Sequence, residues 1–185
     1  MRVEFAAWEK NGRKPPSPSL FKQGVVLHYG KEYRLRTLVE TGTYLGATVN
    51  ACKDAFDRIY SIELNDDFFV RARRKFASCP HITVLQGDSA EVLPSILSQL
   101  QQPALFWLDA HYSGGQTAKA EIETPIMREL ALIFAHHVKG HVILIDDARC
   151  FDGTHDYPTR AAVSALAQAN QYRYAEQDDI IRLVP

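Results

Sequence analysis

Cysteine and long apolar runs are both scarce in this chain of 185 residues. The three cysteines, Cys52, Cys79 and Cys150, are odd in number and share no close spacing, which argues against a disulfide framework or a zinc site and is typical of a reducing compartment. No run approaches the roughly 20 apolar residues of a membrane-spanning helix, and the first residues lack the apolar block of a signal peptide. We therefore expect a cytoplasmic protein.

A strong net charge is missing as well. Lys and Arg number 21 and Asp and Glu 22, for a net charge of −1, so composition gives no electrostatic reason to expect binding to nucleic acid or to a membrane. The length and the 46% hydrophobic content fit one domain with one substantial core. We expect an N-terminal arm and helix in residues 1–36, interrupted by the Pro-rich stretch 14–19, and a core in residues 37–185.

From residue 37 onward, short apolar runs alternate with amphipathic segments, a pattern typical of a parallel sheet covered by helices. The expected strands are Thr37–Thr41, Arg58–Glu63, Ile82–Gln86, Ala104–Asp109 and His141–Asp146. The alternation then ends, and Tyr172–Glu176 and Ile180–Val184 read as a hairpin. The pattern predicts an α/β fold with a doubly wound, mostly parallel seven-stranded sheet and a C-terminal antiparallel hairpin.

Ligands of such sheets bind beyond the carboxyl ends of the strands. The first strand runs into Glu40, Thr41, Gly42, Thr43, Tyr44, Leu45 and Gly46. Gly42 would allow a sharp turn close to a ligand, Gly46 would ease contact between helix and strand, and the amides at the next helix start would suit a carboxylate. An ordinary strand-to-helix turn is the alternative. The spacing is not G-x-G-x-x-G, which disfavours a nicotinamide oxidoreductase.

The next two strands also end in polar residues. Glu63, about twenty residues further on, could accept hydrogen bonds from both ribose hydroxyls of a nucleotide-type cofactor, or could be a helix-capping or surface glutamate. Asp88 and Ser89 follow Gly87 at the end of the third strand and could equally cap a helix.

Taken together, these strand ends resemble those of class I S-adenosylmethionine-dependent methyltransferases, over roughly residues 37 to 184. The resemblance implies a Rossmann-like fold that binds S-adenosylmethionine through the loop from Glu40 to Gly46 and through Glu63. It places Asp88 near the adenine amino group and the Ser89 amide near a ring nitrogen. Tyr44 stands where the usual motif has its middle glycine, a departure shared by several branches of the superfamily.

Acidic residues end the fourth and fifth strands, at Asp109, Asp146 and Asp147. Carboxylates brought together at one sheet edge repel unless protonated or bridged by a cation, and three oxygen donors suit Mg²⁺ with its waters. The arrangement resembles that of metal-dependent, macrocin-type sugar O-methyltransferases. This resemblance implies that Asp109, Asp146 and Asp147 hold Mg²⁺ or another divalent cation, with Asp109 also beside the cofactor and among the catalytic residues. Catechol-type relatives have Asn at the position of Asp147.

His111 stands where the sugar-type relatives place a general base, and histidine can take a proton near neutral pH. The alternative is a structural role in its loop. The expected activity is Mg²⁺-assisted methyl transfer from S-adenosylmethionine to a hydroxyl of a small molecule or glycoside. A metal-independent methyltransferase and a non-catalytic S-adenosylmethionine-binding module are the competing readings. The short segment before the first strand suggests either an open site for a large acceptor or completion of the site by a second subunit, as in a homodimer.

Weaker candidates surround these positions. Gly114 and Gly115 suggest a loop over the substrate or a plain solvent loop, and Glu123 is expected at the surface. Arg149 could bind an anionic substrate or pair with Asp147. The stretch 151–158 is expected to line the rim of a substrate pocket, and the basic run 71–75 is expected to be a solvated helix face.

Overall fold

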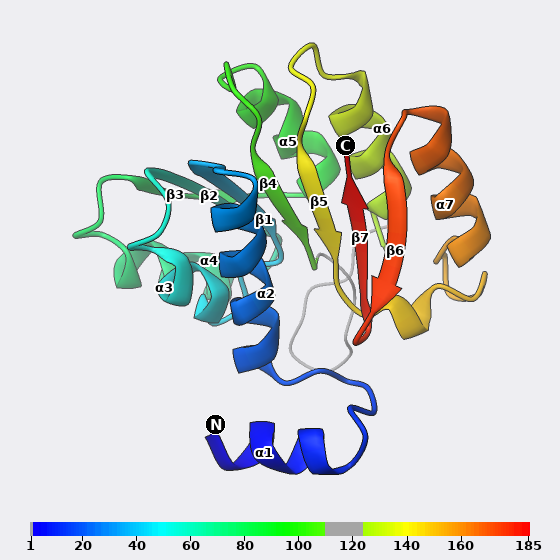
Figure 1. Cartoon of the computed structure of the whole chain (residues 1–185). Coiled ribbons are helices and arrows are strands. Elements are labelled where there is room, and N and C mark those ends of the chain that lie inside the picture. The colour runs from blue at the N-terminus through cyan, green and yellow to red at the C-terminus, as the bar shows by residue number, and fades with distance from the viewer. Residues whose placement is uncertain (1, 110–123) are drawn as a thin grey trace.

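The fold, described by a computed structural model for residues 2–109 and 124–185, is built on a seven-stranded sheet with the order β3-β2-β1-β4-β5-β7-β6 (Figure 1). Its strands are β1 (Thr37–Thr41), β2 (Arg58–Glu63), β3 (Ile82–Gln86), β4 (Leu105–Leu108), β5 (Val142–Ile145), β6 (Arg173–Gln177) and β7 (Ile180–Val184). Strands β1 to β5 pair in parallel, and β7 is antiparallel to both β5 and β6. The predicted fold class is confirmed.

The strand bounds follow from the apolar runs. The predicted bounds of β1, β2, β3 and β7 agree with the structure, whereas β4 and β5 are each one residue shorter at both ends and β6 begins one residue later than predicted. Every residue of β4 and β5 is buried, as expected for central strands covered on both faces. Their flanking aspartates lie just outside the strands.

Among the described residues, three helices cover each face of the sheet. On one face lie α2 (Ser19–Glu32), α3 (Ala47–Cys52) and α4 (Asp66–Lys75), and on the other α5 (Ser89–Leu97), α6 (Ile126–Ala135) and α7 (Arg160–Ala169). Alternate residues of β4 point to the two sides: Trp107 packs in the α2–α4 core and Phe106 in the α5–α7 core. None of the described helices is long and apolar enough to cross a membrane.

A short helix that the sequence pattern did not single out, α1 (Arg2–Lys10), precedes the Pro-rich stretch. It packs against the start of α2, where the rings of Trp8 and Phe21 lie 4.8 Å apart. The segment between the two helices is tied to the β6–β7 turn, because Ser17 Oγ donates to the carbonyl oxygen of Asp178 at 2.6 Å and Arg13 pairs with its carboxylate at 3.2 Å.

The strand order reverses between β1 and β4, the switch point where open α/β sheets bind ligands. Since β1 to β5 are parallel, their carboxyl ends share one edge of the sheet. Figure 1 shows the first turns of α2 at the same edge as the arrowheads of β4 and β5. The predicted cofactor and metal residues that the structure describes lie in the last residues of these strands or in the loops that follow them.

Candidate functional site

The loop between β1 and α3 turns sharply, as predicted, at Gly42, which has φ 86°. The amides of Gly42 and Thr43 both donate to the carbonyl oxygen of Ile62, at 2.9 and 3.2 Å. Gly46 has φ 65°, and a Cβ there would lie 2.8 Å from the Phe76 ring, just beyond α4. Gly46 thus permits a close approach between helices, where the sequence predicted contact between helix and strand.

Two buried glutamates brace this loop. Glu40 is 2% exposed and accepts a hydrogen bond of 2.5 Å from Ser61 Oγ, which lies 2.6 Å from Thr43 Oγ1. Burial raises the pKa of Glu40 to about 8, against the opposing effect of the Ser61 and Thr48 hydroxyls, so this carboxyl is mostly protonated at neutral pH.

Glu63 lies at the end of β2, where the prediction placed it. Its carboxylate accepts hydrogen bonds from the backbone amides of Tyr44 at 2.6 Å and Asn65 at 2.9 Å, which joins the β1 and β2 loops. An ionised carboxylate offers about four acceptor positions, and two are taken by these amides. Binding of a ribose by the remaining positions stays a prediction.

After β3, the sequence left open whether Asp88 and Ser89 cap a helix or contact a ligand. Asp88 is the N-cap of α5 and accepts from the Ala90 amide at 2.8 Å. Ser89 Oγ and, at the end of β1, Thr41 Oγ1 are buried and have no hydrogen-bond partner among the described residues. Buried hydroxyls are normally satisfied, so two such hydroxyls at the same edge of the sheet, at the end of β1 and at the start of α5, fit a site that takes a polar ligand.

Lys75, the last residue of α4, is exposed, as predicted for the basic run, and it also contacts the β1–α3 loop. Its ammonium group donates to the carbonyl oxygens of Leu45 at 2.8 Å and Gly46 at 3.1 Å. The neighbouring Arg73 and Arg74 are exposed, as predicted. Helical spacing cannot distinguish Lys75 from its neighbours, because the contact depends on the position of the β1–α3 loop.

The aspartates that follow β4 and β5 are joined by backbone hydrogen bonds to the end of β1 and to β4. The amide of Asp109 donates to the carbonyl oxygen of Thr41 at 3.0 Å, and that of Asp146 to Leu108 at 3.0 Å. These bonds continue the β1–β4–β5 ladder and hold the two aspartates at neighbouring strand ends. Burial, reinforced by the charge of Asp146, raises the pKa of Asp109 well above its usual range.

A lysine that the sequence did not single out reaches these acids from α2. Lys22 Nζ lies 2.5 Å from Asp146 Oδ2 and 3.4 Å from Asp147 Oδ1. Burial opposes the charge of Lys22, but Asp146 and Asp147 outweigh it and raise the lysine pKa. Burial raises the pKa of Asp146 to about 6, although the ammonium of Lys22 counteracts the rise.

Arg149 forms an ion pair with Asp147. Asp147, in the left-handed conformation with φ 53°, accepts from Arg149 Nη1 at 2.7 Å, and the same guanidinium pairs with Asp179 in the hairpin turn. Of the two roles considered for Arg149, pairing with Asp147 is therefore observed. The two positively charged side chains thus cover Asp146 and Asp147.

The described residues do not fit a divalent metal ion as they stand. The chain's own cations contact Asp146 and Asp147. Within residues 2–109 and 124–185, no three His, Cys, Asp or Glu side chains are grouped so that they could hold a metal ion. The structure therefore does not support the predicted metal site at Asp109, Asp146 and Asp147.

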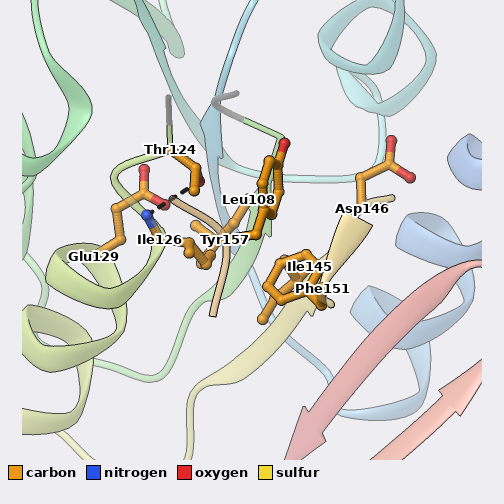
Figure 2. Close-up of a pocket in the computed structure, with 8 residues that line it drawn as sticks. All are labelled: Leu108, Thr124, Ile126, Glu129, Ile145, Asp146, Phe151 and Tyr157. Carbon is orange, nitrogen blue, oxygen red and sulfur yellow. Dashed lines mark hydrogen bonds between the residues drawn. The ribbon is translucent and has the colours of Figure 1, made fainter. Parts of the chain in front are cut away.

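A small pocket lies beside Asp146, and the empty space in and over it, open solvent included, is about 200 Å³. It is lined by Leu108, Thr124, Ile126, Glu129, Ile145, Asp146, Phe151 and Tyr157. Figure 2 shows Glu129 and Asp146 at opposite sides of the lining, with the Tyr157 ring between them. Phe151 and Tyr157 come from the predicted rim, whereas Asp152 binds the amide and hydroxyl of Thr154.

Four predicted positions, His111, Gly114, Gly115 and Glu123, lie outside the described residues. Thr124, the first residue after that gap, lines the pocket and lies 3.4 Å from the amide of Ile126, the first residue of α6. Helix α6 begins at Ile126, and Pro125 occupies its N-cap position.

Comparison with solved structures supports the fold. An O-methyltransferase from Bacillus cereus in complex with SAH matches with a TM-score of 0.64 at 13% identity, over 99% of this chain and 90% of that one. The O-methyltransferase TomG from Streptomyces achromogenes, in complex with SAM, matches with a TM-score of 0.61 at 15% identity, over 97% and 86%. The 23S rRNA methyltransferase ErmE matches with a TM-score of 0.52 at 14% identity, over 87% and 67%. Neither a protein-family model nor a curated protein sequence matches the chain.

Proposed function

With the methyltransferase fold as the premise, we propose that this chain transfers a methyl group from S-adenosylmethionine to a hydroxyl of a small molecule or glycoside. The observation that carries the proposal is the bond between Asp109 N and Thr41 O at 3.0 Å. It holds a cofactor-type glycine loop and a buried acidic group side by side at the switch point of the sheet.

The cofactor half would be formed by the ends of β1, β2 and β3. Glu40, Thr41, Gly42, Thr43, Tyr44 and Gly46 form or brace the loop, with Glu63, Asp88, Ser89 and Asp109 around it. The two buried hydroxyls without partners among the described residues, Thr41 Oγ1 and Ser89 Oγ, are consistent with a polar ligand there. A methyltransferase needs a site of this kind for the methionine and adenosine parts of the donor.

The acceptor half would be the pocket beside Asp146. Phe151 and Tyr157 give it aromatic walls, while Glu129 and Asp146 supply polar groups at its two sides. Most ligand pockets combine apolar walls with a few polar groups in this way. The O-methyltransferase neighbours favour oxygen as the acceptor atom, but the rRNA methyltransferase neighbour has the same fold, so the fold by itself does not select the acceptor.

The donor supplies an electrophilic methyl carbon. The acceptor oxygen forms a bond to that carbon as the carbon–sulfur bond breaks, the electron pair stays on sulfur, and the hydroxyl proton passes to a base. His111 is the base we propose, with Asp109, two positions before it in the sequence, as a second catalytic group. Much of the rate would come from holding acceptor and donor in line.

Magnesium has no part in this proposal, because the side chains that were expected to bind it are paired with Lys22 and Arg149. We further propose that residues 37–185 form the catalytic core of a single domain, with residues 1–36 as an arm that completes the site through α2. We also propose, from the sequence alone, that the chain forms a homodimer.

Calorimetry with S-adenosylmethionine and with a nicotinamide dinucleotide tests the cofactor, and formation of S-adenosylhomocysteine with a panel of hydroxyl acceptors tests the reaction. We expect binding of S-adenosylmethionine only, and turnover with at least one acceptor. Asp146→Asn removes the carboxylate at the wall of the acceptor pocket and its ion pair with Lys22, so turnover should fall and donor binding should be spared, whereas the exposed Asp57→Asn should change neither. Donor binding without turnover on any acceptor would identify a non-catalytic binding module, and binding of the dinucleotide alone would refute the proposal.

A further inference from the structure

Lys22 reaches the acidic site from α2, outside the ends of the strands. It lies in the first turns of α2, 124 positions before Asp146 in sequence, and its ammonium group touches two aspartates of the site. The side chain of Asp146 is fully buried and that of Lys22 is 18% exposed. A buried carboxylate without a counter-charge is strongly destabilising, so the pair satisfies a requirement that burial of Asp146 creates.

A lysine and a divalent ion answer this requirement in different ways. An ammonium group is a compact single charge with three donors, fixed to the chain and present at any metal concentration. A divalent ion needs several oxygen ligands at about 2.0–2.1 Å for Mg²⁺. An ion on Asp146 Oδ2 would lie within about 5 Å of Lys22 Nζ, since the nitrogen is itself 2.5 Å from that oxygen. The two positive charges would repel strongly in a buried site.

We propose that Lys22 is the resident cation of the aspartate site and that its ammonium group takes the place of a divalent metal ion. Its functional consequence rests on the proposed methyl transfer, but the supporting observation is the contact of Lys22 with Asp146 and Asp147. Lys22 holds Asp146 in position at the wall of the pocket, and it shares Oδ1 of the neighbouring Asp147 with Arg149. Methyl transfer by this chain then proceeds without added metal.

Removing the ammonium group of Lys22 tests whether it prevents a divalent ion from binding to Asp146. Lys22→Gln keeps a polar chain and removes the charge, whereas Lys22→Arg keeps the charge. Mn²⁺ binding is measured by electron paramagnetic resonance, and melting temperature is followed with and without Mn²⁺. We expect wild type and Lys22→Arg to bind Mn²⁺ only weakly. Lys22→Gln should bind it at least about tenfold more tightly and gain stability from it, because a ligand of the folded state stabilises that state.

The matched control is the double variant Lys22→Gln/Asp146→Asn. It removes the carboxylate that the ion would use, so the gain in Mn²⁺ affinity should disappear. A merely structural lysine would lower the melting temperature of Lys22→Gln without giving it any affinity for Mn²⁺. That outcome would overturn the proposal.

The wild-type protein tests the same proposal even if Lys22→Gln does not fold. Turnover should be unaffected by a chelator and by added Mg²⁺, and tight stoichiometric binding of Mn²⁺ to wild type would contradict this. The two proposals fail separately. If S-adenosylmethionine does not bind, the proposed function fails whatever the Mn²⁺ result. If it binds and wild-type turnover requires Mg²⁺, only the role of Lys22 is refuted.

Discussion

His141, next to the start of β5, should make the protein lose stability in mild acid, and His141→Asn should remove much of that loss. The ring is 1% exposed. Its Nδ1 accepts from the amide of Ala104 at 3.0 Å, so the ring proton is on Nε2, which faces Nδ1 of His136 at 3.0 Å. A second proton on Nδ1 would set two N–H groups against each other.

The size of the effect follows from the pKa. Burial, with the charge of His136 adding to it, lowers the pKa of His141 from 6.5 to about 4. The unfolded chain therefore takes up this proton at a higher pH than the folded chain, so the contribution is complete above pH 6.5 and is lost as the pH falls toward 4. One pKa unit corresponds to about 1.4 kcal/mol, and the loss at about pH 4.5 comes to about 2.5 kcal/mol.

Urea unfolding at a series of pH values from about 7.5 to 4.5 measures this loss. Asparagine can keep the acceptor for the Ala104 amide through its Oδ1 but does not titrate. The free energy of unfolding of His141→Asn should therefore fall less steeply with acid than that of wild type, by about 2.5 kcal/mol over the range. His28→Asn, at an exposed position on α2, is the control. Parallel curves for wild type and His141→Asn would refute the reasoning.

Two further predictions concern the β1–α3 loop. Gly46→Ala should lower the free energy of unfolding by about 2–3 kcal/mol in urea unfolding, because the backbone there is left-handed and the new Cβ would clash with Phe76. The control Gly140→Ala, with φ 84° and its nearest contact at 3.5 Å, should lower it by about 1 kcal/mol. Equal losses in the two variants would argue against the clash. Lys75→Met should weaken binding of S-adenosylmethionine about fivefold, measured by calorimetry, because it removes the hydrogen bonds from Lys75 to the loop carbonyls. Arg74→Met, at a neighbouring exposed position, should leave the affinity unchanged. Unchanged affinity in Lys75→Met would show that the loop does not need this support.

The sheet was predictable because its strands are short apolar runs between polar stops. The VILI run of β5 is buried over its whole length, and runs of this kind have few alternatives in an alternating α/β pattern. Helix α1 was missed because it carries little apolar periodicity and packs mainly through Trp8 onto Phe21. Its place depends on tertiary contacts more than on local sequence.

The site was predictable only where its residues follow strands. Asp109 and Asp146 could be placed at one edge because the strand direction fixes their position. The side chains that pair with the loop and with the acids, Lys75 and Lys22, lie on helices, where many exposed lysines look alike in sequence. The prediction of a metal ion rested on three carboxylates alone, because the sequence does not show that an ammonium group from α2 reaches the same acids.

The ties between the β6–β7 turn and the segment before α2 bear on how the protein matures. Ser17 and Asp178, whose contact helps to set the entry into α2, stand 161 positions apart. During translation Lys22 leaves the ribosome long before Asp178 is made, and contacts over such separations form late and slowly. A nascent chain therefore has its glycine loop well before its acidic pocket is braced, and the competence of the pocket depends on the final hairpin.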